Sequence, residues 1–238
     1  MPKLSVITIN FNNAAGLEKT INSVIDQSFP DFEFIVIDGS SSDNSLEIIK
    51  KNVNKINYWI SEKDMGIYNA QNKGILASKG EYCLFLNSGD CFVNKDILSK
   101  VFSIQDSSDI IYGDILTIDR NQQVKHLKMP DNIGSFQLFR DTLWHPVSFI
   151  KRELFLKYGN YDEQFKIVAD YEFFVRVIIG KKIATKHIPI EIALFDTSGL
   201  SSDMSKRSQL VRERNQIQDM YFNPVLLFFF RLYSKLRN

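Results

Sequence analysis

The chain has 238 residues, of which 29 are basic and 28 are acidic, so its formal net charge is +1. A dedicated DNA- or RNA-binding protein would have an excess of basic residues, and this balance therefore disfavours that class. A content of 44% hydrophobic and 24% charged residues is ordinary for a globular protein, and the length fits one domain with a short extension. The sequence has only two cysteines, Cys83 and Cys91, which are too few for a disulfide framework, and this favours a reducing compartment such as the cytoplasm. No group of Cys and His residues has the spacing of a zinc site.

Strands and helices alternate through the first half of the chain. Apolar, β-branched runs predict buried strands, and apolar residues at helical spacing predict the helices between them. The predicted strands are Leu4–Ile9, Phe32–Ile37, Asn57–Ile60 and Tyr82–Leu86, and the predicted helices are Ala14–Ser28, residues 46–53 and Ile67–Ser78. This order predicts an α/β fold with a mixed, mostly parallel sheet flanked by helices.

A polar loop adjoins the carboxyl end of each predicted strand. These loops are Asn10–Asn13, Asp38–Asp43, Glu62–Asp64 and Asn87–Asp90. The carboxyl ends of parallel strands share one edge of a sheet, and ligands of open α/β sheets bind at that edge. Any single loop can be polar because it is solvated, but four together predict a binding site.

The second half of the chain is less regular. Asp109–Ile118 and Val124–Lys128 predict a strand pair across a turn, Phe165–Ile179 predicts a helix, and Ile183–Phe195 predicts extended structure. No repeat or low-complexity linker divides the chain. We therefore predict one domain over residues 1–197 and a C-terminal helical extension over residues 198–238.

The C-terminal extension is basic and aromatic. From Met204 onwards it holds seven basic and two acidic residues, so the rest of the chain is net acidic. Residues 221–237 combine an aromatic and aliphatic block with cations, and a helix starting at Pro224 would be apolar on nearly every side. Such a helix must be buried against something, and two explanations stay open. It packs on the domain or in a homodimer, or it attaches the protein to an anionic membrane surface. No apolar stretch is long enough to predict a membrane span, and no signal-peptide pattern begins the chain.

Familiar nucleotide-binding and hydrolase motifs are absent. The sequence has no G-x-G-x-x-G after a strand, no P-loop and no G-x-S-x-G elbow. What remains is a set of loop carboxylates, Asp38, Asp64, Asp90 and Asp170. One or two aspartates together with a substrate diphosphate would suit Mg²⁺ or Mn²⁺.

Several motifs follow one another in order along residues 3–195. Asp38–Ser45 reads DGSSSDNS, and Ser61–Ile75 reads SEKDMGIYNAQNKGI. The first resembles the D-x-G-S-T-D loop of the family 2 glycosyltransferases, and the second resembles a string that marks a subgroup active in bacterial surface-polysaccharide assembly of the colanic-acid type. Further matches are Leu86–Asp90, Ile111–Asp114, His145–Phe149, and Ala169–Glu172 with Arg176. The resemblance implies a GT-A fold and a nucleotide-diphosphate-sugar donor of the UDP or GDP type.

The loops after the first strands are expected to bind the donor. Asp38 can accept hydrogen bonds from a nucleobase or ribose, although the neighbouring polar residues also suit a helix N-cap. Asp64 either contacts the nucleoside or caps the next helix, and Lys73 faces either phosphate or solvent. The expected donor-binding residues are Asn10, Asp38, Asp64, Asn72, Lys73 and Asn87.

The metal motif departs from the family pattern. Where the family has D-x-D-D, this chain has Asn87-Ser88-Gly89-Asp90, so only the last acid is kept. The resemblance implies that Asp90 holds the divalent cation, Mn²⁺ or Mg²⁺, and its alternative is a turn aspartate. The preceding acid, which often holds the donor ribose in the family, is replaced by Gly89.

Sugar transfer with inversion requires a base for the acceptor hydroxyl. The resemblance implies that Asp170 has this role. The alternative is that Asp170 is an acidic residue at a helix N-terminus, where the helix dipole favours a negative charge. Glu172 is a second candidate. Trp144 and His145 are expected to line the acceptor pocket or assist the leaving group, and the alternatives are a core tryptophan and a structural histidine.

The sequence thus predicts an inverting, metal-assisted glycosyltransferase. Its expected acceptor is a glycan or a polyprenyl-linked sugar, and its expected location is the cytoplasm or the inner face of the cytoplasmic membrane. One alternative is a nucleotidyltransferase, which needs a Gly- and Arg-rich loop where this chain has Asn10–Asn13. The other is an inactive nucleotide-sugar-binding or scaffold protein, which the altered metal motif keeps open.

Overall fold

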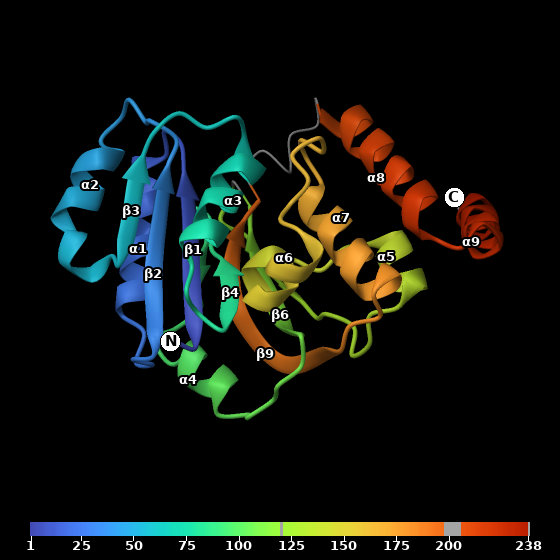
Figure 1. The fold of residues 1–238 in the computed structure, drawn as a ribbon, viewed down its shortest axis with the longest axis horizontal. Coiled ribbons are helices and arrows are strands. Elements are labelled where there is room, and N and C mark those ends of the chain that lie inside the picture. The colour runs from blue at the N-terminus through green and yellow to red at the C-terminus, as the bar shows by residue number, and fades with distance from the viewer. Residues whose placement is uncertain (120, 198–205, 238) are drawn as a thin grey trace.

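The computed structural model describes residues 1–119, 121–197 and 206–237. Within these ranges the strands form one nine-stranded sheet in the order β3-β2-β1-β4-β8-β6-β9-β5, with β7 paired to β6 (Figure 1). The strands are β1 Leu4–Asn10, β2 Phe32–Asp38, β3 Tyr58–Ser61, β4 Tyr82–Phe85, β5 Cys91–Phe92, β6 Ile110–Ile118, β7 Val124–Leu127, β8 Ser148–Lys151 and β9 Thr185–Asp196. The helices are α1 Ala14–Ile25, α2 Ser45–Lys51, α3 Ile67–Ala77, α4 Ile97–Phe102, α5 Ser135–Arg140, α6 Arg152–Tyr158, α7 Ala169–Phe174, α8 Arg207–Tyr221 and α9 Pro224–Arg237.

The first half of the sheet is parallel, as predicted. β1 pairs in parallel with both β2 and β4, and β2 pairs in parallel with β3. Every residue of β1 is buried because helices cover both faces of the sheet. On one face Val6 and Phe34 pack with α1, α2 and α4, and on the other face Ile7 and Ile35 pack with α3, α6 and α7. Alternate side chains of a strand point to opposite faces, which explains this division.

A glycine allows α3 to lie close against the sheet. A Cβ atom added to Gly74 would lie 2.4 Å from Cγ2 of Ile7 in β1. A larger residue would therefore push α3 away from β1. The close approach matters because α3 carries Tyr68, Asn72 and Lys73, and their positions relative to the sheet edge depend on it.

The second half of the sheet is mixed. β8 is antiparallel to β4 and to β6, whereas β9 is parallel to β6. The predicted pairing of two strands across residues 119–123 is confirmed as β6 and β7. The single helix predicted over Phe165–Ile179 begins only at Ala169 and continues after Phe174 as a π-helical turn, Val175–Gly180. Phe165 is buried in the core ahead of the helix, which accounts for the apolar pattern there.

The C-terminal helices pack on the domain. The predicted boundary after residue 197 adjoins residues 198–205, which lie outside the described residues. In Figure 1, α8 and α9 lie on the opposite side of the molecule from α2 and β3. Ile217, Phe222 and Leu227 belong to the same buried cluster as Phe173 in α7, and the helix predicted to start at Pro224 is confirmed as α9. No helix among the described residues has the length and apolarity to cross a membrane.

Candidate active site

Three polar residues end adjacent strands at the same level of the sheet. The strand register places Asn10 of β1 opposite Asp38 of β2, and Asp38 opposite Ser61 of β3. The polar loop that follows β4 lies next to β1, where the backbone amide of Ser88 donates to the carbonyl of Ile9 at 3.1 Å. The predicted gathering of the four loops at one sheet edge is therefore confirmed.

Asp38 is fully buried and holds three segments together. Its Oδ1 accepts hydrogen bonds from Asn10 Nδ2 at 2.8 Å and Ser41 Oγ at 2.6 Å. Its Oδ2 accepts from Ser61 Oγ at 2.6 Å and from the Ser41 amide at 3.0 Å. Burial raises the pKa of Asp38, but these donors outweigh it and hold the pKa below the ordinary value of 3.8. Asp38 thus organises the loop that follows β2, and its contact with a nucleobase or ribose stays a prediction.

Asp64 and Lys73 form an ion pair beside that loop. Lys73 Nζ lies 2.6 Å from Asp64 Oδ1 and 2.8 Å from Glu62 Oε1. Burial lowers the pKa of Lys73, but the two carboxylates outweigh it and raise the pKa above its ordinary value. Asp64 Oδ2 is also 3.0 Å from the point where a Cβ of Gly39 would lie. Two residues predicted to bind the donor are therefore brought together next to the Asp38 loop.

The structure does not bring Asn72 to the donor loops. Asn72 is buried, its Nδ2 donates to the carbonyl of Tyr161 at 3.0 Å, and its Oδ1 accepts from the Tyr161 amide at 3.0 Å. Asn72 Nδ2 also donates to Glu163 Oε1 at 2.8 Å. The amide of Asn72 thus holds the segment around Tyr161, and its contact with the donor stays a prediction.

Glu172 also makes its contacts within the protein. Its Oε1 is 3.0 Å from Arg176 Nε and accepts a 2.6 Å hydrogen bond from the Tyr221 hydroxyl. The side chain is buried and joins α7 to the end of α8. Glu172 therefore links two helices, and its role as a second candidate base stays a prediction.

Asp90 lies in the loop that follows β4, close to a second carboxylate. Its side chain is buried, and its Oδ1 accepts a hydrogen bond from the backbone amide of Asp196 at 3.1 Å. Asp196 Oδ2 lies 3.9 Å from the point where a Cβ of Gly89 would be. The pKa of Asp90 is raised to about 7, chiefly by burial; His145 and the backbone amide of Asp196 lower it, and the carboxylate of Asp196 raises it. This pKa indicates a carboxyl group whose charge the protein itself leaves poorly compensated.

A chain of hydrogen bonds joins Asn87, His145, Asp170 and Tyr68. The amide oxygen of Asn87 accepts from Gln71, so its Nδ2 donates to His145 Nε2 at 3.0 Å. The proton of the neutral imidazole then lies on Nδ1, which donates to Asp170 Oδ2 at 3.3 Å. Three of these four residues were predicted as site residues from the sequence, and the structure places them in contact.

Tyr68 completes the surroundings of Asp170. Its hydroxyl lies 2.9 Å from Asp170 Oδ1 and 2.8 Å from the carbonyl of Ile167. A phenol has one hydrogen, and the charged carboxylate is the stronger acceptor. Burial raises the pKa of Asp170, but the bonds from His145 and Tyr68 and the amide of Tyr171 hold it below its ordinary value. Asp170 is therefore ionised at neutral pH and ready to accept a proton.

Comparison with known proteins decides the family. Residues 5–164, which include all four sheet-edge loops, Asp90 and His145, match the family described as Glycosyl transferase family 2. The chain belongs to glycosyl transferase family 2. This glycosyltransferase is 28% identical over 218 residues to a PGL/p-HBAD biosynthesis glycosyltransferase of Mycobacterium bovis, covering 89% of this chain and 84% of the relative. It is 29% identical over 202 residues to the cholesterol galactosyltransferase of Borreliella burgdorferi, covering 74% of this chain and 55% of the relative.

Solved structures support the GT-A type of fold. S. aureus TarS 1-349 in complex with UDP superposes with a TM-score of 0.66 at 21% identity, over 82% of this chain and 60% of that chain. A mannosyltransferase from Pyrobaculum calidifontis, in complex with GDP-Man and Mn²⁺, superposes with a TM-score of 0.61 at 15% identity, over 81% of this chain and 56% of that chain. The expected fold class is therefore confirmed, whereas this chain spans only part of the solved proteins it resembles.

The family 2 site contains residues that the sequence argument did not select. Tyr68 lies inside the motif string Ser61–Ile75 and was detectable there. Ser61 ends β3, a strand whose carboxyl end was already expected at the site. Asp196 had no sequence signal, because it is 106 residues from Asp90 and only the β5–β9 pairing brings it near.

Trp144 packs within the protein. It is half-buried, and its ring meets Phe195 edge-on with centroids 5.3 Å apart. The imidazole of His145 also meets the ring of Phe195 edge-on, with the two centroids 6.3 Å apart. Trp144 therefore packs beside the segment that carries His145, and its place in the acceptor pocket stays a prediction.

Proposed function

We propose that this glycosyltransferase transfers a sugar with inversion from a nucleoside diphosphate to a hydroxyl group of a glycan or lipid-linked acceptor. The observation that supports this most is Asp170, an ionised carboxylate held by two donors at the edge of the sheet that also presents the Asp38 and Asp64 loops. In an inverting transfer the acceptor oxygen attacks the anomeric carbon while the nucleoside diphosphate leaves from the opposite face. The acceptor proton then passes to Asp170.

His145 and Tyr68 orient the base in this proposal. Their hydrogen bonds fix both oxygens of Asp170, and Asn87 fixes the tautomer of His145. A base held in position typically contributes about 10²–10⁴-fold to the rate. The same bonds lower the pKa of Asp170, so they favour a fixed position over high basicity.

A divalent cation would be held by Asp90 and Asp196. Among the described residues, no group of three or more His, Cys, Asp or Glu side chains could hold a metal ion. Two nearby carboxylates nevertheless fit a hard cation that takes its other ligands from a diphosphate and water. The pKa of about 7 at Asp90 supports this, because a bound cation would compensate its charge. When bound, the cation neutralises charge on the leaving phosphates.

The donor and the pathway are part of the proposal. The names of two solved neighbours include UDP and GDP-Man, which supports a nucleotide-diphosphate-sugar donor of the UDP or GDP type. The motif string Ser61–Ile75 supports a place in bacterial surface-polysaccharide assembly, with a glycan or polyprenyl-linked acceptor. We place the enzyme in the cytoplasm, at the inner face of the cytoplasmic membrane.

The test is release of nucleoside diphosphate from a panel of UDP- and GDP-sugars, with Mn²⁺, with Mg²⁺ and with EDTA. We expect release with one nucleotide class, only with metal, and a transferred sugar whose anomeric configuration is inverted when measured by NMR. Asp90→Ala should abolish release without changing the circular dichroism spectrum. Near-native turnover by Asp90→Ala would remove Asp90 from the metal site, and no release from any donor would favour an inactive binding protein.

A further inference from the structure

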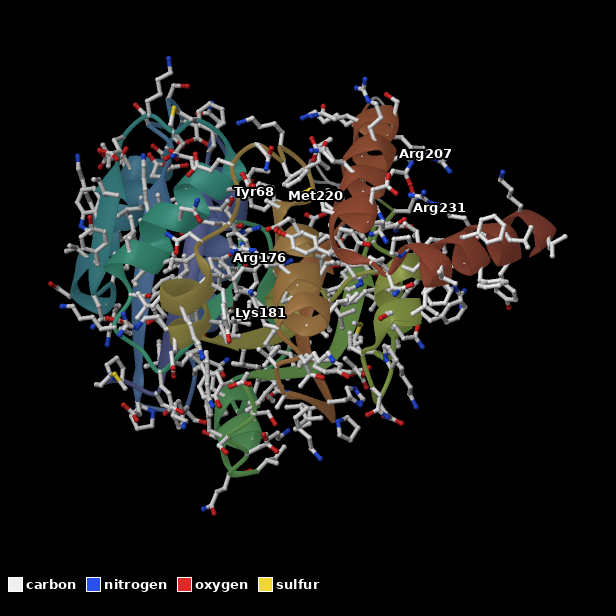
Figure 2. All side chains as sticks on the ribbon, turned by 45° about the vertical axis from the view of Figure 1, so that its right-hand side comes forward. Tyr68, Arg176, Lys181, Arg207, Met220 and Arg231 are labelled. Carbon is white, nitrogen blue, oxygen red and sulfur yellow. The ribbon has the colours of Figure 1, made fainter. Side chains whose placement is uncertain are left out.

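Helix α9 exposes a broad apolar face. Six apolar side chains on this helix are between 44% and 79% exposed to solvent: Val225, Leu226, Phe228, Phe229, Leu232 and Leu236. Val225, Phe229, Leu232 and Leu236 recur at the spacing of one helix face, and Phe228 and Leu226 widen it on either side. Figure 2 shows α9 projecting from the body of the molecule, and none of the residues that the structure describes covers this face.

The opposite side of α9 is anchored. Leu227 is only 5% exposed and belongs to the main core, and the ring centroid of Phe230 lies 5.3 Å from Phe136 and 5.4 Å from Phe139 in α5. Arg231 also forms a 2.9 Å ion pair with Asp219 at the end of α8. The exposed face is therefore presented in a fixed orientation by a docked helix.

A cationic groove borders that face. The groove has a volume of about 690 Å³, lies between α5, α8 and α9, and is lined by Arg140, Gln218, Asp219, Arg231 and Lys235 among others. Within the part of the chain that the structure describes, Arg231 pairs with Asp219, while Arg140 and Lys235 have no carboxylate within ion-pair distance. A smaller hollow next to it is lined by Phe228 and Leu232 together with Arg231 and Lys235, so cations and apolar side chains share one rim.

We propose that α9 and this groove dock the enzyme on an anionic lipid bilayer. The apolar face would enter the boundary between headgroups and acyl chains, and Arg140 and Lys235 would meet lipid phosphates. A second copy of the chain fits less well. An isologous dimer through α9 would bring the same cations of both copies together, within an extension that has seven basic and two acidic residues. The inference rests on the proposed function and adds to it a surface through which the enzyme would meet the membrane that holds a lipid-linked acceptor.

The experiment is co-sedimentation of the full chain with phosphatidylglycerol-containing vesicles and with phosphatidylcholine vesicles, at low and high salt. Truncation at Met220 would remove Phe222 and Leu227, which are buried, so point variants are the sharper tool. One variant combines Phe228→Ser, Phe229→Ser and Leu232→Ser. Its control combines Leu76→Ser and Leu156→Ser, which are 77% and 67% exposed on α3 and α6.

The charge variant combines Arg140→Gln and Lys235→Gln. Its control combines Lys95→Gln and Lys100→Gln, two exposed lysines near α4. We expect the charge variant to bind anionic vesicles about 25-fold more weakly, because each cation removed should weaken binding about fivefold. The affinity of the apolar variant for the same vesicles should fall at least about 30-fold. Both controls should bind like the natural chain, and high salt should weaken binding.

Several outcomes would overturn the docking proposal. The full chain could bind phosphatidylcholine vesicles equally well, it could fail to bind anionic vesicles, or the variants could bind as tightly as the natural chain.

Sedimentation velocity tests the alternative of a dimer. If the natural chain is a dimer, and the apolar variant is a monomer that still binds vesicles equally well, the exposed face of α9 is a dimer interface. Release of nucleoside diphosphate in solution is measured separately. Vesicle binding without any such release would leave the docking intact and reject the proposed transfer.

Discussion

At the scale of single residues, the site is built around the two oxygens of one carboxylate. Oδ2 of Asp170 faces the imidazole of His145, and Oδ1 faces the hydroxyl of Tyr68. Both contacts favour the ionised form, which is the form that can accept a proton. Loss of the carboxylate and loss of one of its partners should therefore have different kinetic signatures.

Replacing Asp170 with Asn keeps the shape of the side chain and removes the proton acceptor. We expect kcat to fall about 100-fold or more, while donor affinity changes by less than about twofold, because only the transition state uses the base. Steady-state kinetics together with calorimetric binding of the donor measure the two effects. An equal loss of donor affinity would instead assign Asp170 to binding or to structure.

Replacing Tyr68 with Phe removes one of the bonds that lower the pKa of Asp170. The pKa of Asp170 should then rise, so the acid limb of the kcat profile should move to higher pH. We expect kcat at neutral pH to fall about 10-fold or more, because one hydrogen bond to a charged group contributes about 1.5–3 kcal/mol. Tyr58→Phe, on the exposed side of β3, is the control. An unshifted acid limb would show that Tyr68 does not act through Asp170.

At the scale of elements, α8 supports the segment that carries Asp170, the proposed base. Glu213 of α8 accepts hydrogen bonds from the backbone amides of Lys166, Ile167 and Val168, directly before α7 begins. Arg214 lies over the ring of Tyr171, with its Cζ 4.1 Å from the ring centroid. The extension that the sequence set apart from the domain therefore holds the start of the helix that carries Asp170.

Glu213→Ala tests this support. Three amides would lose their carboxylate partner, so we expect the free energy of unfolding in urea to fall by about 2–3 kcal/mol. We also expect a lower kcat, because the segment that carries Asp170 is less well fixed. Glu153→Ala, an exposed acid on α6, should change neither quantity. Unchanged stability of Glu213→Ala would mean that α8 only covers the domain.

At the scale of the whole molecule, buried carboxylates link stability to pH. Asp38 joins β1, β2 and β3 through hydrogen bonds that only the ionised group accepts in full, and its pKa in the folded protein lies below 3.8. A folded-state pKa below the unfolded value contributes stability above the unfolded pKa, and this contribution is lost as pH falls through the folded pKa. The parallel half of the sheet should therefore weaken in acid.

Asp38→Asn should lower the free energy of unfolding at pH 7 by about 2–4 kcal/mol, because an amide cannot accept the same set of bonds. The difference from the natural chain should shrink as pH falls below about 4, where the carboxyl group of the unfolded chain takes up a proton, and it should be smallest below the lower pKa of the folded protein. Urea unfolding at several pH values measures this. The exposed Asp141→Asn serves as control, and a difference that is independent of pH would contradict the linkage.

Local patterns in the sequence determined the parallel half of the sheet, its polar edge, α9 and the family, because strand and helix periodicity and motif order are properties of neighbouring residues. Only the tertiary structure decided which polar groups meet. Tyr68 and Asp170 are 102 residues apart, and Asn72 and Tyr161 are 89 residues apart. Such pairings depend on how the mixed half of the sheet and α7 pack against α3. For this reason only the tertiary structure showed that Asn72 and Glu172 hold neighbouring segments, and that Asn87, His145 and Asp170 come together in one hydrogen-bonded chain.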